Sequence, residues 1–310
     1  MIIKIFETIG LRAYIASFGF SFAVIILIDF CKNYPQWGIE NIPDIVIFWL
    51  AFVLFTLYVS YLQTQKFSSK LSGINLLTFP LVFLFFPIGS GLVFHKILIG
   101  ILLVFSKYLF VNARHSKFQN KNLFDLSLAI SVIVLFNTAL AVFYVLPLWL
   151  FLNQKLLQVK SLIALIFPAV LIPFTFHGIA ILFSAEQLML FDHALKIDLW
   201  NYSEQTNAEW IWFGILSIAI YITLFKRPRG PEQFSEFLFM ATWLYLSLII
   251  GFFGLQIGQG RWLLSFIPAA FFVGIFIERT KSDASRNTLI FFGIVFMVLF
   301  KLFDFGVLTI

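Results

Sequence analysis

Long hydrophobic runs separated by short polar loops dominate the pattern along the chain. A membrane-spanning helix needs about 20 mostly apolar residues, because each residue adds about 1.5 Å across roughly 30 Å of hydrocarbon. Runs such as Ile15 to Ile28 carry no polar stripe, so the helices they predict have no face suited to water. The pattern predicts an all-α fold, a polytopic transmembrane bundle of about 10–11 helical segments without a soluble domain.

The predicted spans form one transmembrane domain over residues 1–310. They lie near residues 11–30, 43–62, 73–90, 92–112, 124–137, 138–152, 161–183, 209–225, 234–254, 262–277 and 288–307. The first span is expected to be retained, because no small-residue cleavage pattern follows it. The segment 184–208 is expected to be an external loop, either an interfacial amphipathic helix or a plain connector.

The distribution of basic residues predicts the orientation, because Lys and Arg near span ends prefer the cytoplasm. Four short loops between predicted spans are basic: Lys66 and Lys70; Arg114, Lys117 and Lys121; Lys226, Arg227 and Arg229; Arg279, Lys281 and Arg286. The loop 184–208 instead carries four carboxylates and a single lysine. We therefore predict a multi-pass protein of the inner (plasma) membrane with a cytoplasmic N-terminus and a periplasmic C-terminus.

The number of crossings within residues 124–152 is open. A single crossing would invert the chain and place the later basic loops outside, against the charge pattern. Two short passes, 124–137 and 138–152, restore the agreement. Because each arm is too short for a full crossing, we expect a wedge, a re-entrant hairpin or a locally thinned bilayer.

Composition strengthens the membrane prediction and removes several other classes. Hydrophobic residues make up 61% of the chain and charged residues 12%, with a mean hydropathy of +0.98, whereas soluble domains have roughly half and a quarter. The net charge of +6 is scattered over short loops, so we expect no nucleic-acid partner. The lone Cys31 excludes an internal disulfide and a multi-cysteine metal site. We expect no metal and no cofactor.

Three carboxylates surround the first predicted external loop: Asp29, Glu40 and Asp44. Carboxylates paired at this loop would bind a cation or act as a general base, and they are candidate catalytic residues only if the chain is an enzyme. The alternative is that they are ordinary solvated residues near a helix end.

Ionisable residues inside apolar runs need a partner or a purpose, because hydrocarbon does not solvate charge. His177 lies deep in such a run and is a candidate ligand-binding or proton-relay residue, or a packed histidine beside a prolyl kink. Lys107 is expected to snorkel to the inner face. Lys301 stands three residues before Asp304, which predicts a structural pair on one helix face.

Arg261 follows a glycine-containing turn at the predicted outer interface and precedes Trp262. A guanidinium there binds a phosphate or carboxylate headgroup in bidentate fashion, or anchors the helix at the interface. Prolines inside the apolar runs are expected to bend helices; they are Pro80, Pro87, Pro147, Pro168, Pro173 and Pro268.

Two segments resemble known membrane proteins. The first lies within residues 112–152 and includes Asn112-Ala113-Arg114, Asn122-Leu123-Phe124-Asp125-Leu126-Ser127-Leu128, Leu135-Phe136 and Tyr144-Val145-Leu146-Pro147. It resembles an uncharacterised family of polytopic inner-membrane proteins from Bacteroidota, in which a basic loop also leads into a Phe-Asp start and a short apolar hairpin. That family offers no catalytic residues to carry over.

The second segment covers residues 260–268 and reads Gly260-Arg261-Trp262-Leu263-Leu264-Ser265-Phe266-Ile267-Pro268. It is similar to the Arg-aromatic-Leu-Leu-Pro-x-x-Pro stretch of membrane glycosyltransferases that use polyprenyl-phosphate sugars, with Ser265 in place of the first proline. The resemblance implies an essential carboxylate in the first external loop, at Asp29, Glu40 or Asp44.

Three functions fit the sequence. The first is a non-enzymatic inner-membrane component of bacterial cell-envelope machinery for secretion, motility or surface-polymer export, which contacts membrane lipids and a membrane-protein partner. The chain lacks phosphate-loop, zinc-protease and nucleophile-elbow motifs, which fits this reading. The second is a lipid-linked glycosyltransferase-like enzyme with a carboxylate base and Arg261 on a lipid phosphate. The third is a small-solute or ion transporter lined by His177, Asn137 and Lys301.

Overall fold

The structure is a computed structural model made of helices. It describes residues 10–33, 94–115, 119–136, 138–153, 158–182, 207–225, 231–252, 262–280 and 282–304, with position 38 and short helical stretches within 42–57 and 77–82. Every regular element in these residues is helical, which confirms the all-α part of the prediction. The chain divides into two compact units: unit 1 comprises residues 1–88, 202–227 and 266–310, and unit 2 comprises 89–201 and 228–265.

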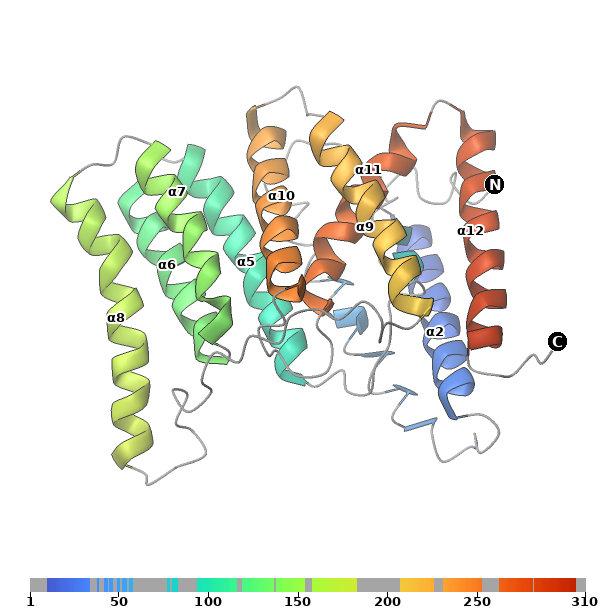
Figure 1. The fold of residues 1–310 in the computed structure, drawn as a ribbon, viewed down its shortest axis with the longest axis horizontal. Coiled ribbons are helices and arrows are strands. Elements are labelled where there is room, and N and C mark those ends of the chain that lie inside the picture. The colour runs from blue at the N-terminus through green and yellow to red at the C-terminus, as the bar shows by residue number, and fades with distance from the viewer. Residues whose placement is uncertain are drawn as a thin grey trace. The chain divides into compact units, whose positions relative to one another are not determined.

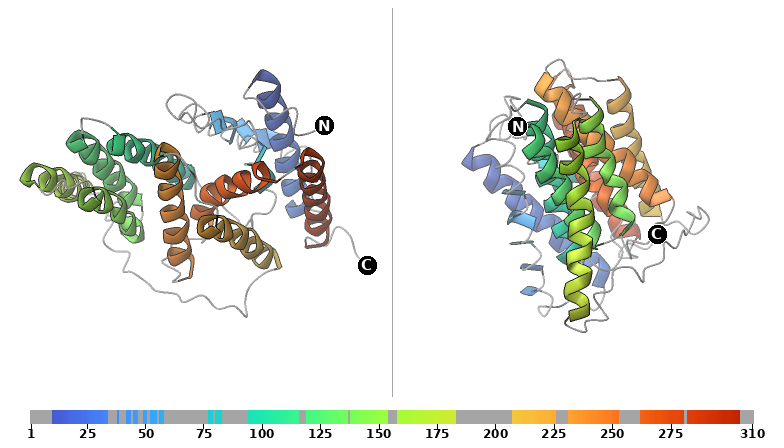
Figure 2. Two further views of the ribbon diagram at one scale, coloured as in Figure 1. Left: turned by 90° about the horizontal axis from the view of Figure 1, so that it is seen from above. Right: turned by 90° about the vertical axis from the view of Figure 1, so that its left-hand side faces the viewer.

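Unit 2 contains a row of packed helices (Figures 1 and 2). Its elements are α5 (Phe94–His115), α6 (Gln119–Phe136), the 3-10 helix η2 (Thr138–Tyr144), α7 (Val145–Asn153), α8 (Val159–Leu182), α10 (Pro231–Phe252) and the 3-10 helix η6 (Leu263–Ser265). Helix α6 packs against both α5 and α8, and α5 also packs against α10. The α5–α10 contact therefore joins two segments that are far apart in the sequence.

The chain reverses direction after α6. The Ser131 hydroxyl lies 2.6 Å from the Tyr144 hydroxyl, so η2 returns alongside α6. Between α8 and α6, Ser161 donates to Asn120 at 2.7 Å and Ser127 donates to the Leu165 carbonyl at 2.6 Å, so α8 runs parallel to α6. Residues 124–152 thus form two antiparallel arms. Their depth in a bilayer stays a prediction.

Three prolines of the described helices stand where helices tolerate them, and two stand inside a helix. Pro231 begins α10, and Pro147 and Pro268 stand in the first turns of α7 and of α11 (Phe266–Glu278), where backbone N–H groups have no intrahelical acceptor. Pro168 and Pro173 instead lie inside α8, which continues through both. Helix α8 therefore gives up backbone hydrogen bonds in its middle.

Unit 1 contains α2 (Leu11–Asn33), α9 (Asn207–Phe225), α11 and α12 (Asp283–Asp304). Helix α11 packs on α9 and is mostly buried, whereas α12 contacts α2. The indole N–H of Trp49 reaches α2, where the Phe18 carbonyl accepts at 3.0 Å and the Ser21 hydroxyl lies at 3.2 Å. The 13 residues of α11 make a helix of about 20 Å, shorter than the hydrocarbon layer.

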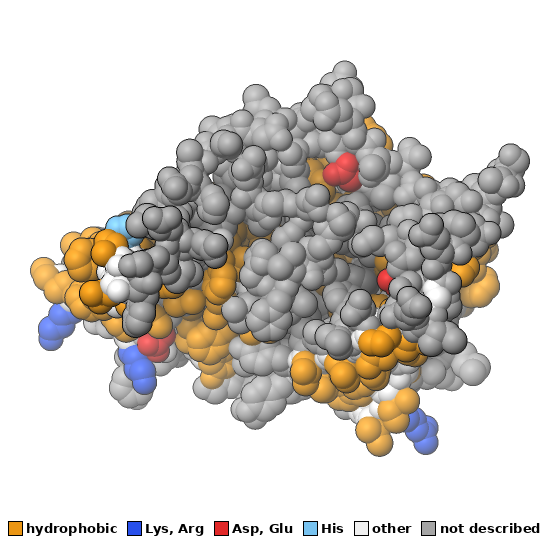
Figure 3. Space-filling model, turned by 90° about the horizontal axis from the view of Figure 1, so that it is seen from below, with side chains coloured by type: hydrophobic (Ala, Val, Ile, Leu, Met, Phe, Trp, Pro, Cys, Tyr) orange, Lys and Arg blue, Asp and Glu red, His pale blue; other side chains and the backbone are white. Residues whose placement is uncertain are grey.

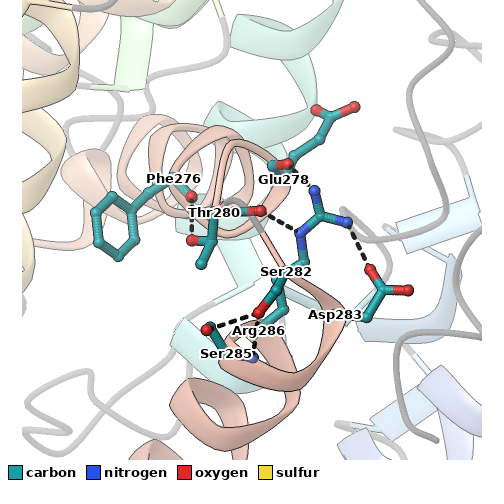
Figure 4. Close-up of polar contacts among 7 residues, drawn as sticks. All are labelled: Phe276, Glu278, Thr280, Ser282, Asp283, Ser285 and Arg286. Carbon is teal, nitrogen blue, oxygen red and sulfur yellow. Dashed lines mark hydrogen bonds and ion pairs between the residues drawn. The ribbon is translucent and has the colours of Figure 1, made fainter.

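A tight corner joins α11 to α12 (Figure 4). Arg286 donates to two carbonyls at the end of α11, at 2.6 Å to Glu278 and 2.8 Å to Thr280, and pairs with Asp283 at 3.1 Å. The Ser282 hydroxyl accepts from the backbone N–H of Ser285 and caps α12. One arginine of the fourth basic loop therefore also closes the C-terminus of a helix.

Among the described residues, four helices are long and apolar enough to cross a membrane, judged by length and composition. They cover Leu11–Phe30, Val159–Ile179, Gln233–Phe252 and Asp283–Phe300, and shorter apolar helices cover Leu140–Asn153, Glu209–Phe225 and Phe266–Glu278. On the face drawn in Figure 3, the described side chains are mostly hydrophobic, and the Lys and Arg side chains lie at the edges of the hydrophobic areas. The full set of crossings and their direction stay predictions.

Candidate functional site between α5 and α10

The most demanding polar contact among the described residues is an ion pair buried in unit 2. The Lys107 ammonium on α5 donates to the Glu236 carboxylate on α10 at 2.7 Å. The two side chains are only 1% and 4% exposed. Removing both charges from water is costly, and their attraction repays this only when they lie close together in good geometry. The pair therefore fixes how α5 and α10 pack.

Aromatic side chains close to the pair in the sequence pack together on these two helices. The Phe110 and Phe239 rings meet edge to face with centroids 5.3 Å apart, and the Trp243 ring follows one turn further along α10. All three side chains are buried. The indole N–H of Trp243 has no hydrogen-bond partner among the described residues. An apolar surrounding weakens screening, so charges here interact more strongly than at a wet surface.

A second cation lies on the same face of α5. Arg114 follows Lys107 by seven residues, which is two helical turns. Its guanidinium carbon lies 5.5 Å from the centroid of the Trp149 ring on α7 and 5.3 Å from that of Phe234 in the first turn of α10. The Nη1 atom of Arg114 is buried and has no hydrogen-bond partner in the part of the chain that the structure describes.

We call Lys107, Arg114 and Glu236 the α5–α10 seam. It brings together two cations and one carboxylate, and the carboxylate bonds to Lys107. A buried ion pair of this kind holds two helices together or changes its protonation during a functional cycle. No group of three or more His, Cys, Asp or Glu side chains that could hold a metal ion occurs among the described residues.

The sequence-predicted candidates are not part of this seam. Asp29 is half-buried near the end of α2 in unit 1, and His177 is half-exposed on α8 in unit 2; both engage in interactions. Glu40, Asp44, Asn137 and Arg261 lie outside the described residues. Lys301 and Asp304 belong to the end of α12, but their side chains lie outside the description, so their pairing stays a prediction.

The expectation for Lys107 is wrong. Its side chain does not snorkel to an aqueous face, because Glu236 on the facing helix satisfies the ammonium inside the fold. Sequence reasoning missed Glu236 altogether. The sequence did contain a sign of this pair. Glu236 lies inside the predicted span 234–254 and Lys107 inside the predicted span 92–112, and each charge needs a partner in hydrocarbon.

A polar pattern of a different kind links α6 to its neighbours. Buried serines on α6 and α8 bond to a backbone carbonyl or a side-chain oxygen across the helix interface. Small hydroxyl residues let helices approach closely and supply hydrogen bonds where water is absent. This arrangement is a packing device, and it leaves the seam as the candidate functional site.

Comparison of the chain with protein-family models, curated protein sequences and solved structures gives no match.

Proposed function

We propose that the chain is an integral inner-membrane component of bacterial cell-envelope machinery for secretion, motility or surface-polymer export, and that it acts without catalysis and together with partner proteins. The observation that supports this most is the pair of largely uncovered apolar helices, α8 and α12. Apolar surface of this extent is unfavourable in water and is normally covered by lipid or by another protein. In a bilayer, lipid and a partner helix together would cover the exposed apolar surfaces of α8 and α12.

Helix α8 shows the pattern most clearly. It packs on α6 through small residues, with Ser161 and Ala164 buried. Outward it presents a stripe at helical spacing that includes Phe167, Val170 and Phe174, which are 49%, 61% and 76% exposed. Helix α12 carries a second stripe, with Phe292, Val295, Phe296 and Leu299 exposed. Two bulky stripes offer surfaces for neighbouring membrane helices.

Site-specific photo-crosslinking in cells tests whether a partner protein contacts the exposed stripes of α8 and α12. A photoreactive residue replaces Phe174 or Phe292, and adducts are identified by mass spectrometry after purification in a gentle detergent. Discrete protein adducts at one of these positions support the proposal. The matched control is Leu11, which is 75% exposed at the start of α2 outside both stripes. Lipid adducts alone at both stripes, with purified protein that is monodisperse and free of partners, would contradict it.

A second function, small-solute or ion transport, is favoured by the α5–α10 seam. Ionisable pairs inside membrane bundles commonly mark substrate or proton pathways, and Lys107 with Glu236 is such a pair. Proton or cation flux into proteoliposomes tests it. Flux that the conservative variant Glu236→Gln abolishes, while the exposed-site variant Lys121→Gln retains it, supports transport. If the ion flux into proteoliposomes with the wild-type protein is no greater than the flux into protein-free vesicles, transport of the ions tested is excluded.

A further inference from the structure

The Arg114 side chain is incompletely satisfied. A guanidinium has five N–H donors that lie in its plane, while aromatic rings interact with its flat faces. The rings of Trp149 and Phe234 lie within 5.5 Å and 5.3 Å of its central carbon. These contacts satisfy the charge in part, but they provide no acceptor for Nη1, which is buried and unpartnered among the described residues. An orphaned charged donor is costly unless an acceptor arrives.

The charges near Arg114 indicate which kind of group would accept a hydrogen bond from its Nη1 atom. The described carboxylate of the seam, Glu236, is 2.7 Å from Lys107 and buried with it. Phe234 stands in the first turn of α10, so the positive end of that helix dipole lies close to Arg114. The described α5–α10 seam thus carries one more positive than negative charge. It favours an anion with several oxygen atoms.

The position of Arg114 in the chain narrows the class of anion. Arg114 follows the predicted span 92–112 and belongs to the basic loop that is predicted to face the cytoplasm. Basic sites between membrane helices at that depth bind the phosphate groups of anionic lipids. We propose that Arg114, held between Trp149 and Phe234, is the centre of a site for a phosphate ester, supplied by an anionic lipid of the inner leaflet. This site rests on the proposed membrane location.

Lipid binding to the protein in neutral detergent tests the site. Thermal unfolding is followed while phosphatidylglycerol is added at constant ionic strength, with diacylglycerol of the same acyl chains as the phosphate-free control. We expect phosphatidylglycerol to raise the unfolding temperature in a saturable way and diacylglycerol to have no such effect. Equal effects of the two lipids would overturn the proposal.

Variants locate the site. Arg114→Gln removes a charge-assisted hydrogen bond, so the affinity for phosphatidylglycerol should fall about 10- to 100-fold. Arg114→Lys keeps the charge but loses the planar fork, so a smaller loss is expected. It also serves as the test variant if the glutamine variant does not fold. Lys121→Gln removes one exposed charge from the same loop region and should leave the affinity nearly unchanged. Equal losses for Arg114→Gln and Lys121→Gln would indicate diffuse attraction and contradict the site.

Inorganic phosphate and glycerol 3-phosphate distinguish the two sources of the phosphate group. Weak or absent stabilisation by these soluble anions, beside strong stabilisation by phosphatidylglycerol, supports the lipid. Stabilisation by the soluble anions alone, lost in Arg114→Gln, overturns the lipid source. If the protein is recovered from the aqueous fraction without detergent, the membrane location fails, and the soluble anions still test whether Arg114 binds phosphate.

Discussion

Lys107 and Glu236 show how a single contact decides the packing of two helices. Each residue alone would leave an unpaired charge in an apolar interior, whereas the pair, 2.7 Å apart, neutralises both. The same reasoning applies to Arg114, whose charge is spread over two aromatic faces instead of a carboxylate. In unit 2 the buried charges are thus held by neighbours from other helices.

The ion pair predicts a non-additive effect on stability. Lys107→Met or Glu236→Met alone should destabilise the protein by about 3–5 kcal/mol, because each leaves a buried charge without its partner. The double variant Lys107→Met/Glu236→Met should recover most of that loss, since it removes both charges and keeps apolar volume. Unfolding in mixed micelles measures all three. A double variant whose loss equals the sum of the single losses would show that the two side chains are not coupled.

Glu278 predicts a dependence of stability on pH. Burial at the end of α11 raises the pKa of its carboxyl above the ordinary 4.5, while Arg279 and Arg286 act in the opposite direction. The folded protein therefore holds this proton more tightly than the unfolded chain. Its stabilising contribution is complete below pH 4.5 and is lost as the pH rises through the raised pKa.

The variant Glu278→Gln tests this dependence. It should match the wild type in acid and become the more stable protein as the pH rises above 4.5 through the raised pKa. The difference in unfolding free energy between the two proteins is measured between pH 4 and pH 8, which covers this window. A difference that is independent of pH, or one that grows toward acid, would contradict the effect of burial on this carboxyl.

At the scale of elements, α10 meets the returning chain at a close contact. A Cβ atom added to Gly251 would approach the Trp262 indole, with Cε3 at 2.7 Å, so glycine allows the ring to lie against the helix. The Trp262 ring also meets the Phe252 ring edge to face at 5.4 Å. This contact joins the end of α10 to Trp262, which directly precedes η6.

Gly251→Ala should therefore destabilise unit 2 by about 1–3 kcal/mol through overpacking against Trp262. The matched control is Gly178→Ala in α8, where a Cβ meets nothing within 4 Å. That variant should be neutral or stabilise by up to about 1 kcal/mol, because alanine favours helix. Both are compared by thermal unfolding in the same detergent. Equal stability of the two variants would show that the Trp262 ring moves aside without a loss of stability.

The α11–α12 corner provides a second element-level prediction. Arg286 donates to the Glu278 carbonyl at the end of α11 and to the Thr280 carbonyl just beyond it, and it pairs with Asp283 (Figure 4). Arg286→Lys keeps the charge but cannot reach all three acceptors, so a loss of about 1–3 kcal/mol is expected. Arg279→Lys, at an exposed side chain in the same loop, is the control. If both variants unfold at the wild-type temperature, the hydrogen bonds at this corner do not contribute to stability.

The sequence predicts helices well and their partners poorly. The predicted span 234–254 and the observed α10 (Pro231–Phe252) nearly coincide, because hydrophobicity marks the apolar part of a helix directly. The pairing of Lys107 with Glu236 depends on which helices pack together, and 129 positions separate the two residues. The sequence indicates the reversal within residues 124–152 only through the charges of distant loops. A hairpin keeps the later basic loops on the same side of the membrane as the earlier ones, whereas a single crossing would not.

At the scale of the whole molecule, the two units share one chemical character. Apolar helices occur in each, and each carries one long helix with bulky exposed side chains, α12 in unit 1 and α8 in unit 2. Such surfaces are stable in hydrocarbon and unfavourable in water. This is the basis on which we place the chain in a membrane.

Topology gives a whole-molecule prediction. If residues 124–152 form a hairpin, the loop after α7 faces the cytoplasm. Leu157→Cys in a Cys31→Ser background should then resist a membrane-impermeant thiol reagent in intact spheroplasts and react after lysis. Labelling before lysis would mean that the segment crosses once.

The most direct test of the central claim is extraction of cell membranes. We predict that the full chain stays in the membrane pellet after washes with alkaline carbonate and urea, and that only detergent releases it, because its apolar helices are solvated by lipid. Release into the carbonate supernatant as a monodisperse, detergent-free protein would contradict the membrane location and the orientation built on it.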